Sequence, residues 1–453
     1  MAKIPTVAII GRPNTGKSTL FNRLIGRRRA IISDIPGTTR DHISSMVEND
    51  DLDYLLIDTG GMGGGTDDHD FEDDVHAQSL LAMEHADLIL FTINSREELT
   101  ANDHQVVQLL RKNRKQHVPV IIVLTKSDNP ALLDALLPQY YQLGIADDIV
   151  AVSALNRVGV DELEDYIIRY LQKQNFEKQA VREQTEESTP SVAIIGKPNV
   201  GKSSLVNAMM SEAQRKMSPR LVSEIPGTTR DTTDTLIRYH DREFLFVDTA
   251  GLKRHAQTEE GIDSYAYLRT IQALEQSDIA LMVLDATQPL AKQDKRVAAL
   301  AIERGKGLIF LLNKIDLLTT EQKKEKIDEI KATFLFCRFA PVIPCSTVTR
   351  EGLLKMFDLI EALQRNRTRR LAIKELNRWF KHSVEGQPLG PVSKAKHITQ
   401  ADAIPPTFVL FVKNPKEIEV SQIRFLDNRI RETFDFQGTP IRWIMKSGRE
   451  REQ

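Results

Sequence analysis

The chain has very little cysteine and tryptophan: two residues of each in 453. Cys337 and Cys345 are too few for a disulfide framework or a four-ligand zinc site, which excludes both kinds of scaffold. Long apolar runs are also missing, because a stretch such as 118–124 has the length of a strand, whereas a membrane helix needs about 18 apolar residues. The initial segment MAKIPTVAII shows no signal-peptide features. These absences predict a cytoplasmic protein with no membrane association.

Length and charge suggest how the chain is divided. At about 150 residues per domain, 453 residues predict three domains. The net charge of −2 is unevenly spread: residues 365–453 contain 18 Lys and Arg against 10 Asp and Glu, a balance of +8, which leaves −10 for the rest. A basic carboxyl-terminal region places any nucleic-acid contact at that end of the chain.

Five short motifs occur twice in the same order, 185 to 193 residues apart. The pairs are GRPNTGKSTL (11–20) and GKPNVGKSSL (196–205), IPGTTRD (35–41 and 225–231), DTGG (58–61) and DTAG (248–251), TKSD (125–128) and NKID (313–316), and SAL (153–155) and STV (346–348). A repeat of this order at nearly constant spacing indicates a duplicated domain.

Each copy alternates hydrophobic strands with amphipathic helices. In the first copy we expect strands at 7–10, 52–57, 88–93, 119–125 and 149–153, and helices at 17–25 and 160–171. This alternation predicts an α/β fold: a mostly parallel sheet with helices on both faces and ligand loops at the carboxyl ends of the strands. The expected divisions are a first copy of the repeated domain at 1–171, a polar, acidic linker at 172–190, a second copy at 191–364, and a basic domain at 365–453. The linker is either flexible or an extension of the preceding helix.

The longest repeated motif matches GxxxxGK[ST], a phosphate-binding loop (P-loop). Its glycines let the backbone wrap around phosphates with N–H groups pointing inward, at the start of a helix. We expect Lys17 and Lys202 to reach the β- and γ-phosphates, and Ser18 and Ser203 to bind Mg²⁺. The other loop residues assigned to the nucleotide are Gly11, Arg12, Pro13, Asn14, Thr15 and Gly16, and Gly196, Lys197, Pro198, Asn199, Val200 and Gly201.

The next two motifs are expected to surround the γ-phosphate and its metal. Asp58 and Asp248 end hydrophobic strands and are predicted to act through Mg²⁺, as are Thr39 and Thr229 of the repeated IPGTTRD segments. The residues that follow the aspartates complete this part of the site: Thr59, Gly60, Gly61 and Met62, and Thr249, Ala250, Gly251 and Leu252. Catalytic roles are predicted for Lys17, Thr39, Gly60, Lys202, Thr229 and Gly251.

Neither copy has the glutamine that orients the attacking water in many GTPases. The position holds Met62 in one copy and Leu252 in the other. Hydrolysis is therefore either slow or supported by another group or ion.

The xKxD motifs predict a preference for guanine. The carboxylates of Asp128 and Asp316 can accept hydrogen bonds from the ring N–H and amino group of guanine, whereas adenine would leave them unpaired. The neighbouring residues predicted to hold the base are Thr125, Lys126, Ser127, Ser153 and Ala154, and Asn313, Lys314, Ile315, Ser346 and Thr347. The chain is thus expected to bind GTP and GDP and to hydrolyse GTP.

With these motifs in place, the chain closely resembles the EngA (Der) family of tandem bacterial GTPases over nearly its whole length. The carboxyl-terminal segments LNRWF (376–380), PPTFVLFVKNP (405–415) and GTPIRW (438–443) look like that family's KH-like domain. The resemblance implies a cytoplasmic, partly ribosome-associated factor in assembly of the large ribosomal subunit, in which two GTP states rearrange the domains. A monomer is expected.

The resemblance also implies a potassium ion in place of the missing glutamine. In related GTPases an asparagine of the P-loop helps to hold this ion, and Asn14 and Asn199 occupy that position. The alternative is that these asparagines only shape the turn. The sequence departs from the family pattern at Thr125, where asparagine is usual, and at Thr347, where alanine is usual. These departures put the relative affinities of the two sites in question.

The carboxyl-terminal region is predicted to be an α+β unit. We expect a basic helix at 366–384 with Leu371, Leu376 and Trp379 in the core, strands at 406–412 and 440–445, and a helix at 423–434. It lacks the GxxG loop of true KH domains, so either RNA is held in another way or the unit packs against the GTPase domains. Two other functions remain open, a tRNA-modification GTPase and a non-hydrolysing, GTP-gated RNA-binding scaffold.

Overall fold

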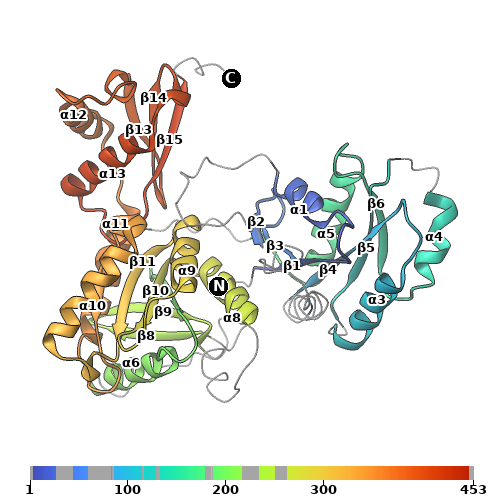
Figure 1. Cartoon of the computed structure of the whole chain (residues 1–453), viewed down its shortest axis with the longest axis horizontal. Coiled ribbons are helices and arrows are strands. Elements are labelled where there is room, and N and C mark those ends of the chain that lie inside the picture. The colour runs from blue at the N-terminus through green and yellow to red at the C-terminus, as the bar shows by residue number, and fades with distance from the viewer. Residues whose placement is uncertain are drawn as a thin grey trace. The chain divides into compact units, whose positions relative to one another are not determined.

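The computed structural model describes residues 4–26, 44–59, 83, 86–114, 117–128, 133–178, 185, 187–216, 234–249 and 263–447. These residues form two compact units, one within 4–178 and one within 185–447 (Figure 1). No helix within the described ranges is both long enough and apolar enough to cross a bilayer.

The first unit is a six-stranded sheet with helices on both faces. Its strand order is β2-β3-β1-β4-β5-β6, with β2 antiparallel to β3 and all other neighbours parallel. The strands are β1 (Thr6–Ile10), β2 (Ser44–Val47), β3 (Tyr54–Asp58), β4 (Leu88–Asn94), β5 (Val120–Thr125) and β6 (Asp148–Val152). Apolar residues of α1 (Lys17–Ile25) and α5 (Val160–Lys173) pack on one face, and those of α3 (Ala101–Asn113) and α4 (Leu133–Tyr141) on the other.

The predicted α/β fold is confirmed, and helix α1 has the predicted bounds. Helix α5 ends at Lys173, so residues 174–178 of the predicted linker do not continue it. The edge strand β2 was not predicted, because its sequence SSMV is short and only its last residue is buried.

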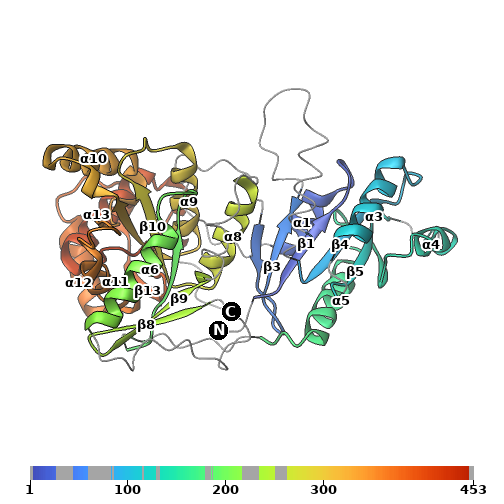
Figure 2. The ribbon, with the colours of Figure 1, turned by 90° about the horizontal axis from the view of Figure 1, so that it is seen from below.

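The second unit contains a sheet of the same design. Its order is β12-β11-β10-β7-β9-β8, and only the β8–β9 pair is antiparallel. The strands are β7 (Ser191–Ile195), β8 (Thr235–Tyr239), β9 (Arg242–Val247), β10 (Ile279–Asp285), β11 (Gly307–Asn313) and β12 (Val342–Pro344). Helices α6 (Lys202–Lys216) and α11 (Leu353–Thr368) share one apolar core with the strands, and Figure 2 shows α6 in front of β9 and β10. Further helices in the described part of this sheet's domain are α8 (Asp263–Glu275), α9 (Lys292–Glu303) and α10 (Thr320–Thr333).

The same unit continues into a small α+β region at its carboxyl-terminal end. Strands β13 (His397–Ala403) and β14 (Pro406–Val412) are antiparallel, and β15 (Arg442–Ser447) runs parallel to β14. Helices α12 (Ile373–Val384) and α13 (Val420–Phe434) contribute one core with this sheet, and both lie beside it in Figure 1. The α+β prediction is confirmed, although β13 was missed because HITQADA lacks a hydrophobic alternation.

The predicted single helix at 366–384 is wrong. Its first residues belong to the end of α11, and residues 369–372 are not helical before α12 begins. The cause is a tertiary contact, since the Gln400 side chain accepts from the backbone N–H of Leu371 and donates to the carbonyl of Arg369, both at 2.8 Å. Leu376 and Trp379 are buried as predicted, while Leu371 is half-buried beside the same core.

The carboxyl-terminal region is joined to the second GTPase-type sheet by direct hydrogen bonds. Gly438 donates to the Phe339 carbonyl at 2.8 Å and accepts from the Leu308 N–H at 2.7 Å. The predicted boundary between residues 364 and 365 falls inside α11, whose buried Arg367 donates to the carbonyl of Asp278 and lies 3.6 Å from its carboxylate. This packing agrees with one of the two roles considered for the region.

Candidate functional site

Each P-loop connects a buried strand to a helix, as its motif requires. Gly16 has a left-handed φ of 88° immediately before α1, and Gly201 has a φ of 100° before α6. The Lys17 ammonium group donates to the carbonyls of Gly11 and Arg12, both at 2.8 Å. Lys202 does the same in the second copy, at 2.7 and 2.5 Å to Gly196 and Lys197.

The surroundings of these two lysines suit a partner with strong negative charge. Burial lowers the pKa of Lys17, and lowers that of Lys202 to about 8. A phosphate favours the charged ammonium form, because it adds an attraction between opposite charges that a neutral carbonyl does not provide. The geometry therefore suits phosphate binding in both loops.

The structure brings together two predicted magnesium ligands of the first domain. The Ser18 hydroxyl donates to a carboxylate oxygen of Asp58 at 2.8 Å, although the residues are 40 positions apart in the sequence. Parallel pairing of β1 and β3, with Ile9 opposite Asp58, creates this proximity. A hydroxyl and a carboxylate oxygen are hard donors of the kind that Mg²⁺ prefers, so the pair fits the ion.

Several predicted site residues lie outside the described residues, and the structure does not place them. They are Thr39, Gly60, Gly61, Met62, Thr229, Ala250, Gly251 and Leu252.

One asparagine connects three loops in the second domain. The Asn313 side chain donates to the Val200 carbonyl of the P-loop at 2.9 Å and accepts from the Thr347 N–H at 3.2 Å. A Cβ atom on Gly201 would lie 2.3 Å from the Asn313 amide nitrogen, so this close approach needs glycine there. Lys314 adds an ion pair with Asp285 at 2.6 Å.

The first domain makes these connections with different residues. The Thr125 hydroxyl lies within hydrogen-bonding distance of the Thr15 carbonyl, which keeps the link to the P-loop. The loop at Ala154 is held by α1, because the Arg23 guanidinium donates to the carbonyls of Ala154 and Leu155 at 2.5 and 3.0 Å. The equivalent position on α6, 185 residues later, is Ala208, which cannot donate from its side chain.

The two aspartates predicted to select guanine also differ in their surroundings. Asp128 accepts from the Ser153 hydroxyl at 2.7 Å, from the Asn156 amide at 3.0 Å, and from the Arg96 guanidinium. The Ser153 hydrogen bond and then the Arg96 contact lower the pKa of Asp128. Within the described part of the chain, no side-chain hydrogen bond or ion pair reaches the Asp316 carboxylate.

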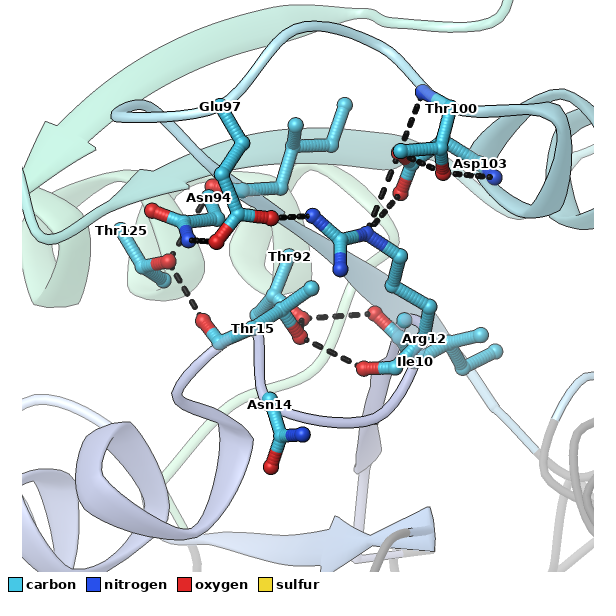
Figure 3. A network of polar contacts seen from close by, with 12 residues as sticks. Ile10, Arg12, Asn14, Thr15, Thr92, Asn94, Glu97, Thr100, Asp103 and Thr125 are labelled. Atoms are coloured by element: carbon cyan, nitrogen blue, oxygen red, sulfur yellow. Dashed lines mark hydrogen bonds and ion pairs between the residues drawn. The ribbon is translucent and has the colours of Figure 1, made fainter.

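Figure 3 shows a polar network behind the first P-loop. Arg12 forms an ion pair with Glu97 and lies 3.2 Å from Asp103, the residue that caps the start of α3 together with Thr100. The Asn14 side chain points away from this network. In the second domain an ion pair between Lys197 and Asp294, at 2.7 Å, ties the P-loop to α9.

Sequence reasoning missed the supporting roles of Arg23 and Arg96 and the acidic partners of Arg12. A signal was present in the repeat itself, since Arg23 and Arg96 stand where the second copy has Ala208 and Thr287. Aligning the two copies marks these positions as different, although it does not reveal what the side chains contact.

Comparison with known proteins agrees with this geometry. A family model described as a 50S ribosome-binding GTPase matches residues 6–126 and again 191–314. A second model, the KH-domain-like region at the carboxyl-terminal end of EngA bacterial GTPases, matches residues 370–446.

The similarity to curated relatives extends from end to end. The GTPase Der of Alkaliphilus metalliredigens is 39% identical over 460 residues, covering 99% of this chain and 100% of that protein. The GTPase Der of Geobacillus sp. strain WCH70 is 38% identical over 448 residues, covering 98% and 99%. With two P-loops, two xKxD motifs and the matching carboxyl-terminal region, the chain belongs to the EngA (Der) family of GTPases.

Proposed function

We propose that this GTPase acts in assembly of the large ribosomal subunit, using GTP binding and hydrolysis in both domains. The observation that carries the proposal is the match of both GTPase domains to a 50S ribosome-binding model, within full-length similarity to GTPase Der. The basic carboxyl-terminal region supports a partner rich in phosphate. The protein is then a cytoplasmic monomer that spends part of its cycle on the ribosome.

The two nucleotide sites are assigned the same division of labour. Lys17 and Lys202 bind the β- and γ-phosphates, and Asp128 and Asp316 select guanine. The ligands proposed for magnesium are Ser18, Thr39 and Asp58 in the first site, and Ser203, Thr229 and Asp248 in the second. When bound, this ion would neutralise charge on the transferred phosphoryl group. The short contact between Ser18 and Asp58 supports the first set.

Potassium is proposed as the second cation at each site. Asn14 and Asn199 are exposed and take left-handed φ values of 65° and 62°, a conformation that suits the turn itself. The Asn14 side chain also points away from the internal network, so its amide oxygen is positioned to contact a ligand outside the loop (Figure 3). When bound, potassium would supply positive charge beside the phosphates, the chemistry that an arginine finger supplies elsewhere.

The domain boundaries are part of the proposal: a first GTPase domain at 1–171, a linker at 172–190, a second GTPase domain at 191–364 and a KH-like domain at 365–453. The tRNA-modification alternative is less well supported, because relatives named GTPase Der cover both GTPase domains and the carboxyl-terminal region.

Sedimentation with ribosomal particles tests the function. The full-length protein should sediment with isolated large-subunit particles in the presence of a non-hydrolysable GTP analogue, and less with GDP. Small-subunit particles are the control. Equal sedimentation with both kinds of particle, or none with either, would contradict a role in large-subunit assembly.

A further inference from the structure

We propose that Arg96 competes with guanine for the Asp128 carboxylate and thereby sets the nucleotide affinity of the first site. This inference rests on the proposed role of Asp128 in guanine recognition and adds a regulator to it.

Arg96 is built into the base-recognition loop from the end of a neighbouring strand. It lies just beyond β4, where its backbone N–H donates to the Asn94 side chain at 3.2 Å. Its Nε donates to the Lys126 carbonyl at 3.2 Å, and its guanidinium forms an ion pair with the Asp128 carboxylate. One side chain therefore contacts both the backbone and the selecting carboxylate of the TKSD loop.

The hydrogen-bonding capacity of Asp128 is almost fully used. A carboxylate offers about four acceptor positions. Ser153 and Asn156 donate to one oxygen, and Arg96 donates to the other. Guanine brings two further donors, its ring N–H and its amino group, so at least one of the three protein donors must leave.

Arg96 is the strongest competitor among the donors that can leave. Ser153 is buried, whereas Arg96 and Asn156 are exposed. Both bonds reach a carboxylate, but only the Arg96 bond also joins opposite charges, so Arg96 opposes guanine binding more strongly than Asn156 does. The Arg96 side chain is 64% exposed and that of Asp128 38%, so solvent can replace the pair at modest cost.

The second domain has no arginine at the position equivalent to Arg96. Asn94 pairs with Thr125 in the first sheet, as Asp285 pairs with Asn313 in the second, which makes Thr287 the counterpart of Arg96. Thr287 directs both its N–H and its hydroxyl to Asp285, at 2.9 and 2.7 Å. It therefore leaves Asp316 to the base.

The test measures GDP binding at the first site of the full-length chain. Asp316→Asn is used as the background, because it should remove guanine binding from the second site and leave one GDP per chain. In this background Arg96→Thr, which copies the second domain, should tighten GDP binding about two- to fivefold. The gain should shrink as salt is raised, because salt screens an exposed ion pair. Arg169→Thr, at an exposed arginine of α5, is the control for loss of one positive charge.

A second pair of variants separates this inference from the proposed function. Asp128→Asn should shift the first site towards xanthine nucleotides, and adding Arg96→Thr to it should leave XDP affinity unchanged. If Asp128→Asn shifts specificity but Arg96→Thr leaves GDP binding unchanged or weakens it, the competition is refuted and the selecting role of Asp128 stands. If Asp128→Asn produces no shift, the proposed base recognition itself fails.

Discussion

The two GTPase domains carry the same five motifs but hold them in place differently. In the second domain, one side chain, Asn313, connects the P-loop to both base-recognition loops. In the first, the same task is divided among Thr125, Arg23 and Arg96, which come from a strand end, a helix and a loop. The motif residues proposed to face the nucleotide are thus similar, while the side chains that hold them in place differ. Affinity differences between the sites should therefore trace to the supports.

The largest expected effect comes from the residues that the two sites share. Asp316→Asn should weaken GTP binding at the second site at least about 100-fold and favour XTP, because the amide presents a donor where a carboxylate accepted. Binding of labelled GDP and XDP to the full-length chain measures this. Asp128→Asn is the matched change at the first site. Unaltered GTP binding in either variant would remove that aspartate from base selection.

The next effect concerns the cation that the two sites are proposed to share. Replacing potassium by sodium should slow single-turnover GTP hydrolysis about tenfold or more, corresponding to about 1.4 kcal/mol of barrier. Asn199→Ala should slow the potassium-supported rate while GDP binding stays nearly intact, because the ion acts mainly in the transition state. Asn14→Ala tests the first site in the same way. Equal rates in the two salts would point instead to a group supplied by the ribosome.

A smaller effect tests whether Arg23 replaces the missing asparagine of the first site. Arg23→Ala should weaken GDP binding there about tenfold, since it removes two hydrogen bonds from a charged donor. Thr125→Asn should tighten binding a few-fold to tenfold, by adding a neutral hydrogen bond to the Ala154 loop. In the double variant the loss from Arg23→Ala should be smaller than in the wild type. Strictly additive effects would show that the two side chains support the loop independently.

The smallest effect concerns the pH dependence of stability, and it arises at Lys306, close to the contact between Arg367 and Asp278. The pKa of Lys306 is lowered to about 7, mainly by burial and also by the nearby charge of Arg367, while Asp278 acts in the opposite direction. The unfolded state, with an ordinary lysine pKa of 10.5, therefore binds more protons between about pH 7 and 10.5. This linkage makes the free energy of unfolding rise with pH across that window. Below pH 7 the lysine is protonated in both states, so burial of the charged group lowers the free energy of unfolding by its full amount.

Lys306→Met should flatten this part of the pH profile and stabilise the second unit at neutral pH. When the sheet register is extended beyond the paired residues, Lys306 aligns with the buried Val118 of the first domain, so an apolar side chain has a precedent at this position of the fold. Denaturant unfolding at several pH values makes the measurement, with Lys331→Met on exposed α10 as the control. An unchanged slope would mean that Lys306 does not titrate in this window.

The sequence predicted what depends on local pattern, and missed what depends on distant contacts. The strand and helix periods, the P-loops and the xKxD motifs were sufficient for the α/β fold and for both candidate sites. The break at 369–372 was missed because it depends on Gln400, some 30 residues further on. Arg23 was missed for a stronger form of the same reason, since its carbonyl partners lie 131 and 132 positions away.

Helix α11 connects the second candidate site to the carboxyl-terminal region. It begins just after the loop that contains Thr347 and runs without interruption for 16 residues to Thr368, beyond the residues that bond to the carboxyl-terminal region. At 1.5 Å per residue, this rod is about 24 Å long. A tilt of about 5° at the Leu353 end would move the Thr368 end by about 2 Å. A small displacement at the start of α11 would therefore become a larger displacement at its end, where Asn366 bonds to the KH-like region.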